Sequence, residues 1–147
     1  MDWTKIAIDK LCKYPDKKES LKNIKAQLAA LEAESTSVKG FVTDKIPASG
    51  GGDAYSDKQL NIIVEKEELI ARYNTTRKQI GPIEEALNKL TEDERYILDI
   101  SYMHRSLNYT FTRQMDDKFH VGKTQAYRMR TKALKRFTLL LYGTIEE

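Results

Sequence analysis

The sequence predicts an all-α protein with an N-terminal helical hairpin and a C-terminal unit of three short helices. Apolar residues recur every three or four positions between Leu21 and Leu31, which is the spacing of one helix face. Thr91–Glu94 has the pattern of a capping box, which marks the start of a helix. Residues 123–137 divide into an apolar and a cationic side at about 100° per residue.

The N-terminal region is predicted to contain two helices. A short amphipathic helix over residues 3–12 ends before Pro15, and a second helix spans about Ser20–Ser35. The steps of three and four in the second helix are those of a coiled coil or helical hairpin. The residues expected to face inward are Trp3, Ile6, Ala7 and Leu11 in the first helix and Leu21, Ile24, Leu28 and Leu31 in the second.

A flexible loop is expected over residues 39–55, since three consecutive glycines at 50–52 disfavour a helix. A third helix then runs from about Ser56 to Gln79, and Gly81-Pro82 should interrupt it because proline lacks a backbone donor. Residues 83–89 could continue as a kinked turn. The predicted seam of this helix is Leu60, Ile63, Ile70, Tyr73 and Ile80, broadened by Ile62 and Leu69.

Residues 1–87 are therefore predicted to form an antiparallel hairpin. A two-helix hairpin has a thin core, so we expect it to form a homo-oligomer through these helices. An intramolecular bundle, covered only by the C-terminal unit, is the open alternative.

Residues 88–142 are predicted to be a separate domain. The capping box starts a helix that continues to about His104 and turns Leu90, Ile97, Leu98 and Ser101 to a core. After a connection at residues 107–109, a short helix spans about Phe111–Phe119. A turn at His120–Gly122 leads to the last helix, with Gly122 as its N-cap.

The positive charge is concentrated in this domain. Residues 110–142 carry eight basic and two acidic side chains, although the whole chain has a net charge of only +3. Ala126, Met129, Ala133 and Phe137 share one side of the last helix, opposite Thr124, Arg128, Thr131 and Lys135 with Tyr127 and Lys132 flanking them. A local cationic helix is the electrostatic pattern of a nucleic-acid-binding protein.

Several motifs resemble a known family. Leu90–Leu98, the short helix ending at Phe119, Val121, and the run Ala126…Met129…Lys132-Ala133-Leu134 resemble region 4 of bacterial sigma factors. That module is a helix-turn-helix that reads the promoter −35 element. The whole chain resembles phage and prophage late-gene regulators of the ArpU and RinA type. The resemblance implies sequence-specific DNA binding that activates phage late operons.

Two positions depart from the pattern of sigma region 4. Asp116 stands where such modules have Ala or Gly, so its carboxylate must lie at an edge or find a partner such as Lys118 or Arg113. Gly122 replaces the usual Ser or Thr before the recognition helix. The other promoter-binding regions of a sigma factor are absent, so promoter melting by this chain alone is not expected.

The resemblance implies a recognition helix over about residues 123–137, lying in the major groove. Arg128 suits a bidentate contact to guanine and Gln125 one to adenine. The expected base-contacting residues are Lys123, Thr124, Gln125, Tyr127 and Arg128. The expected phosphate-contacting residues are Arg113, Arg130, Thr131, Lys132, Lys135 and Arg136. The alternative is an ordinary solvated basic face.

Other classes of function find little support. The two histidines, His104 and His120, and the single Cys12 have no metal-ligand spacing, and no cofactor or catalytic constellation is expected. Ser49–Gly52 lacks the Lys-Ser/Thr of a phosphate loop. No apolar run reaches the length of a membrane span, and the N-terminus lacks a signal-peptide pattern. A cytoplasmic, nucleoid-associated protein is expected.

Three functions therefore stand at this point. The first is a phage-type transcriptional activator that binds double-stranded DNA as an oligomer, with host RNA polymerase as a further candidate partner. The second is a DNA-packaging component such as a small terminase subunit. The third is a coiled-coil structural or adaptor protein whose basic helix binds an acidic partner.

Overall fold

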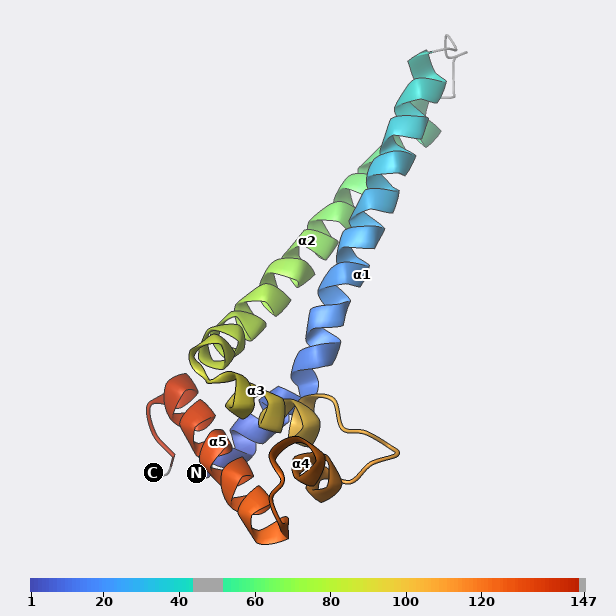
Figure 1. The fold of residues 1–147 in the computed structure, drawn as a ribbon. Coiled ribbons are helices and arrows are strands. Elements are labelled where there is room, and N and C mark those ends of the chain that lie inside the picture. Colours follow the sequence, from blue (N-terminus) through green and yellow to red (C-terminus); the bar gives the residue numbers. More distant parts are fainter. Residues whose placement is uncertain (44–51, 146–147) are drawn as a thin grey trace. The chain divides into compact units, whose positions relative to one another are not determined.

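The protein is all-α, as the sequence predicts. The structure, a computed structural model, describes residues 1–43 and 52–145, and in these residues it contains helices and no strand (Figure 1). Its elements, in chain order, are α1 (Trp3–Thr43), α2 (Gly52–Lys89), α3 (Glu92–Leu98), the π-helical turn η1 (Asp99–Met103), α4 (Phe111–Phe119) and α5 (Lys123–Tyr142).

The predicted break near Pro15 is wrong, because α1 is one continuous helix from Trp3 to Thr43. A proline at position 15 removes the hydrogen bond that its own N–H would donate to the Leu11 carbonyl, and its ring crowds that carbonyl. Leu11 and Tyr14, four residues and one residue before Pro15, are both buried. The Tyr14 hydroxyl also donates to Glu84 Oε1 at 3.2 Å. These tertiary contacts compensate for the missing backbone bond.

The predicted interruption at Gly81-Pro82 is also wrong, since α2 continues to Lys89. Ile80 and Ile83 flank the pair and are fully buried, so packing again holds the helix together. The predicted loop over 39–55 is wrong at both ends, because α1 extends to Thr43 and α2 begins at Gly52. The rest of that prediction, residues 44–51, lies outside the described residues.

The chain divides into two compact units. The terminal unit consists of Met1–Lys18 and Gln79–Glu147, and the hairpin unit consists of Glu19–Lys78. The sequence predicts a single boundary between residues 87 and 88, whereas the observed units are divided at two places in the chain. The start of α1 and the end of α2 belong to the terminal unit, because their buried residues Ala7, Leu11, Ile80 and Ile83 add to its core.

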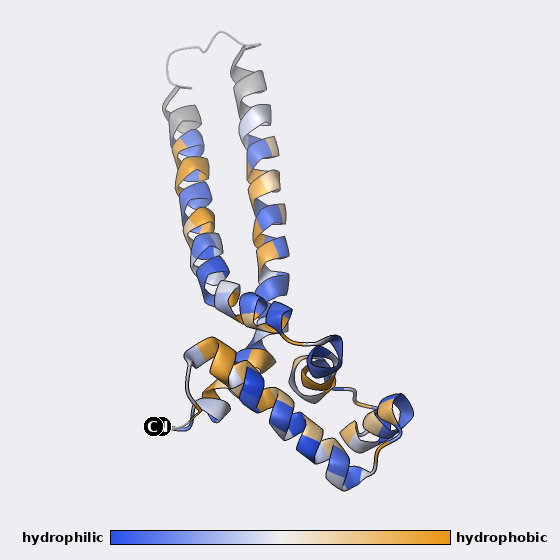
Figure 2. Ribbon diagram, turned by 60° about the vertical axis from the view of Figure 1, so that its left-hand side comes forward, coloured by the Kyte–Doolittle hydropathy of each residue, from blue (hydrophilic) through white to orange (hydrophobic). Residues whose placement is uncertain are grey.

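The hairpin unit pairs α1 and α2 in antiparallel orientation. Gln59 Nε2 donates to Ser35 Oγ at 3.1 Å, and Lys66 forms an ion pair with Glu32. Further along, the Lys25 ammonium lies 5.7 Å from the centre of the Tyr73 ring. Apolar residues recur along both helices (Figure 2), and the core they form contains Ile24, Leu31, Ile62 and Leu69, with Leu28 and Tyr73 packed against it.

The seam of α2 is rotated from the predicted one. Ile62 and Leu69, expected only to broaden it, are its buried residues, whereas Leu60, Ile63 and Ile70 are 58%, 44% and 47% exposed. Tyr73 and Ile80, also predicted, do turn inward. A shift of one residue in the register turns a helix by about 100°. Steps of four and three from Ile62 through Lys66, Leu69, Tyr73 and Thr76 to Ile80 describe the observed face.

The terminal unit begins α3 with the predicted capping box. Thr91 Oγ1 accepts from the Glu94 backbone N–H, and Glu94 Oε1 accepts from the Thr91 N–H, each at 3.2 Å. The helix passes into η1, where the buried Ser101 hydroxyl donates to the Ile97 carbonyl. The four residues predicted to face the core from this region, Leu90, Ile97, Leu98 and Ser101, are all buried.

Both ends of the described chain meet in the terminal unit (Figure 1). The Trp3 backbone N–H donates to the Ile145 carbonyl at 3.3 Å, and the rings of Trp3 and Tyr142 lie 4.7 Å apart. α5 contacts both α3 and α4, and Phe137 is the largest of its fully buried side chains.

We expect Phe137→Ala to lower the free energy of unfolding by about 3–5 kcal/mol, because it leaves a cavity at a fully buried site. Fluorescence of Trp3, the single tryptophan, reports on this unit during denaturant unfolding. Leu139→Ala is the matched control, because Leu139 lies on the same helix and is 47% exposed. Equal midpoints for the two variants would contradict this packing.

Candidate nucleic-acid interface

α4 and α5 are joined by a short turn whose backbone conformation depends on residues close to it in the sequence. Thr110 caps α4, its side chain accepting from the Arg113 N–H at 3.2 Å. His120 ends α4 in the left-handed conformation with φ of 56°, and its N–H donates to the Asp116 carbonyl. Gly122 is the N-cap of α5, as predicted, so the start of α5 has no capping hydrogen bond from an N-cap side chain. The turn at 120–122 thus lies where the sequence predicts it.

One side of α5 is buried. Of the predicted apolar stripe, Ala126, Ala133 and Phe137 are buried and Met129 is half-buried, and Leu134 and Thr138 extend the stripe. The Thr138 hydroxyl donates to the Leu134 carbonyl at 2.7 Å, which satisfies the polar group inside the core. Burial of this side sets the rotation of α5 about its own axis, so the opposite side faces outward.

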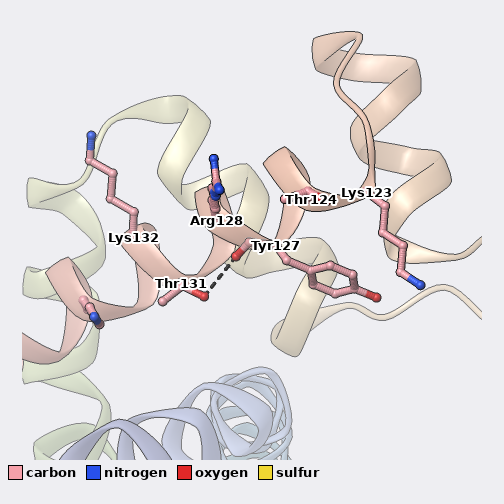
Figure 3. A pocket seen from close by; sticks show the side chains of 7 residues that line it. Lys123, Thr124, Tyr127, Arg128, Thr131 and Lys132 are labelled. Carbon is pink, nitrogen blue, oxygen red and sulfur yellow. Dashed lines mark hydrogen bonds between the residues drawn. The ribbon is translucent and has the colours of Figure 1, made fainter.

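The outward side of α5 is a cationic surface, which we call the α5 face. Figure 3 shows Arg128 and Lys132 projecting to the same side of the helix, and the Thr131 hydroxyl donating to the Tyr127 carbonyl at 2.9 Å. Every residue of the face is exposed. A shallow hollow is lined entirely by its side chains, those of Lys123, Thr124, Tyr127, Arg128, Thr131, Lys132 and Lys135.

Seven predicted site residues therefore come together on the α5 face. Four were expected to contact bases (Lys123, Thr124, Tyr127, Arg128) and three to contact phosphates (Thr131, Lys132, Lys135). α5 contains no acidic residue, so the four cations of this face have no neutralising carboxylate on their own helix. Such an arrangement favours a polyanion over a neutral partner.

The remaining predicted residues lie elsewhere. Gln125 is exposed but does not line the hollow. Arg113 belongs to α4, where its guanidinium lies 5.0 Å from the centre of the Tyr109 ring. Arg130 is half-buried against aromatic rings on another side of α5. These three residues do not line the hollow of the α5 face, so the structure gives their predicted DNA contacts no support from that surface.

Arg136 makes internal contacts that sequence reasoning missed. Its Nη1 donates to Glu94 Oε1 at 2.6 Å, and Nη2 donates to the Lys89 carbonyl at 3.5 Å. Glu94 also belongs to the capping box of α3, so a single carboxylate serves both elements. No local pattern predicts this pair, because its members are 42 positions apart in the chain.

Asp116, the departure from the sigma-factor pattern, is exposed on α4. Its carboxylate therefore remains hydrated, and the cost of burying an unpaired charge does not arise at this position. The sequence expectation that this residue would lie at an edge agrees with its exposure.

Within the described part of the chain, no cluster of His, Cys, Asp or Glu is arranged to hold a metal ion. None of the helices in that part is long and apolar enough to cross a membrane. Comparisons of this chain with family models, with curated proteins and with solved structures found no match. The case for a function therefore depends on the residues and geometry described above.

Proposed function

We propose that this protein binds double-stranded DNA in a sequence-specific manner, with α5 as its recognition helix. The observation that carries the proposal is the α5 face: seven exposed cationic, hydroxyl and aromatic side chains on one helix whose other side is buried. An α-helix is about 10–12 Å wide with its side chains, and the major groove of B-DNA is about 12 Å wide. A helix with this division of faces suits insertion into that groove.

The residues near the start of α5 suit contacts with bases. Arg128 is exposed near the middle of the face and can present two parallel donors to the O6 and N7 atoms of guanine. Lys123, Thr124 and Tyr127 complete this part. Further along, Lys132 and Lys135 suit phosphates. Gln125 remains a candidate for adenine only if the groove also reaches the flank of the face.

The biological role we propose is regulation of phage or prophage late genes. It rests on the resemblance of about residues 88–140 to sigma region 4 and of the chain to regulators of the ArpU and RinA type. Action in the bacterial cytoplasm at the nucleoid, and direct contact with host RNA polymerase, belong to the same proposal. A DNA-packaging role is the second candidate, favoured if the protein forms ring-shaped assemblies.

An exposed aliphatic stripe on α2 supports self-association. Leu60, Ile63, Val64 and Ile70 are 58%, 44%, 46% and 47% exposed and lie on the side of α2 away from Ile62 and Leu69. Clustered apolar side chains in water favour association. We propose that a second copy of this chain covers the stripe, which gives a DNA-binding oligomer.

We expect the wild-type protein to shift duplex DNA in a gel, to enrich particular sequences from a random pool, and to bind more weakly as salt rises. Arg128→Ala should lose about 1–3 kcal/mol of discrimination at one base position, because a bidentate contact is removed. Lys58→Ala on α2 is the control for loss of a cation elsewhere. Unchanged selectivity of Arg128→Ala would refute the base-contact assignment.

Lys135→Ala should weaken binding to all duplexes alike, because it removes about one phosphate contact. The slope of log affinity against log salt should fall by about 0.9, measured by fluorescence anisotropy on selected and scrambled duplexes. Loss of affinity at a single base position would assign Lys135 to base contact instead.

Ile63→Glu should shift the protein to a smaller assembly in sedimentation velocity, because it places a charge within the aliphatic stripe. Asn61→Glu adds the same charge to an exposed α2 residue outside the stripe and should leave the assembly unchanged. A wild-type protein that is monomeric at all tested concentrations would exclude the oligomer. Ring-shaped assemblies would favour packaging over regulation.

A further inference from the structure

Arg130 occupies an aromatic cage beside the α5 face. Its guanidinium carbon lies 4.8 Å from the ring centres of both Phe111 and Tyr127, and 6.0 Å from that of Tyr102. The Phe111 and Tyr127 rings are themselves 5.7 Å apart. Stacking of this kind holds the guanidinium through its faces and leaves its N–H donors, which lie in its plane, for other partners.

The charge of Arg130 is not neutralised within the cage. Among the residues that the structure describes, no carboxylate forms an ion pair with Arg130. Tyr102 does not supply a negative charge either, because burial raises the pKa of its phenol and outweighs the opposing effect of Arg130 and Arg105. A stacked cation without a counterion is poised to take an anion.

A second cation, Arg105, lines the same cavity as Arg130. The cavity measures about 380 Å³ and lies between α5 and the connection over residues 104–110. Arg105 is exposed, and no described acid pairs with it. The connection is ordered by Ser106, whose Oγ accepts from the backbone N–H groups of Asn108 and Tyr109 at 3.1 and 3.2 Å.

The cavity and the α5 face share one residue, Tyr127. The guanidinium of Arg130 lies beside the ring of Tyr127, so the cavity adjoins the α5 face on the side of that ring. A helix in the major groove has a sugar–phosphate backbone along each of its two edges.

We propose that the cavity of Arg105 and Arg130 binds a backbone phosphate at the edge of the groove next to Tyr127. Two guanidinium groups with free donors match the oxygens of a phosphodiester. The 104–110 connection thereby becomes part of the DNA-binding surface, which the sequence-based assignment confined to α4 and α5. This inference rests on the proposed function, because it presumes a duplex held on α5.

The test is a scan of neutral methylphosphonate substitutions along both strands of the selected duplex, with affinity measured for the wild type and for variants. Wild type should lose about tenfold at the phosphate bound in the cavity, because a charge-assisted contact is removed. Arg105→Ala should show less than about a twofold loss at that same phosphate. Its side chain is exposed, so this variant should fold normally.

Lys132→Ala is the matched control. It should remove sensitivity at a different phosphate and leave that of the cavity phosphate unchanged. Arg130→Lys, which keeps the charge but not the planar fork, should weaken the contact at the same phosphate as Arg105→Ala.

The outcomes separate this inference from the proposed function. If wild type binds duplex DNA and Arg105→Ala keeps full sensitivity at every phosphate, the cavity does not bind a phosphate. That result would leave the proposal of DNA binding intact. Wild type that shifts no duplex would overturn the proposed function and the inference together. Sensitivity lost by Arg105→Ala and Lys132→Ala at one and the same phosphate would also refute the assignment of a separate phosphate to the cavity.

Discussion

The division of α5 into a buried and a cationic side is the constraint on which the candidate site depends. Ala126, Ala133 and Phe137 are withdrawn from water against neighbouring helices, and a fully buried phenylalanine contributes about 1.5–3 kcal/mol relative to an exposed one. Rotating α5 about its axis would expose these side chains and bury lysines and arginines, which costs far more. The cations of the α5 face are thus presented together as a consequence of core packing, without any bond that holds each of them in place.

The cations of α5 have different surroundings despite their similar chemistry. Arg136 contacts Glu94 and the Lys89 carbonyl, which ties α5 to the start of α3. Arg130 is stacked on aromatic rings, and Arg128 extends freely from the face. An exposed ion pair contributes little to stability, so the Arg136 contact matters more for orienting the two helices than for its energy. Three cations of the same helix therefore lie in three environments: an ion pair, an aromatic cavity and an open surface.

The two compact units share both long helices. α1 and α2 begin and end in different units, and each passes a proline near the boundary of the terminal unit. Pro15 and Pro82 both lie inside continuous helices. In the proposed function, the hairpin unit would join copies of the chain, and the terminal unit would carry the α5 face.

The sequence alone determined the features that depend on neighbours within one or two helical turns. These are the Thr91–Glu94 capping box, the bounds of α4, the turn at 120–122, and the two sides of α5. Tertiary structure decided the rest. Pro15 and Pro82 remain in helices because flanking residues are buried, and the seam of α2 follows Ile62 and Leu69 because α1 covers that side. The Arg136–Glu94 pair and the Arg130 cage join residues of different elements, so no local pattern contains them.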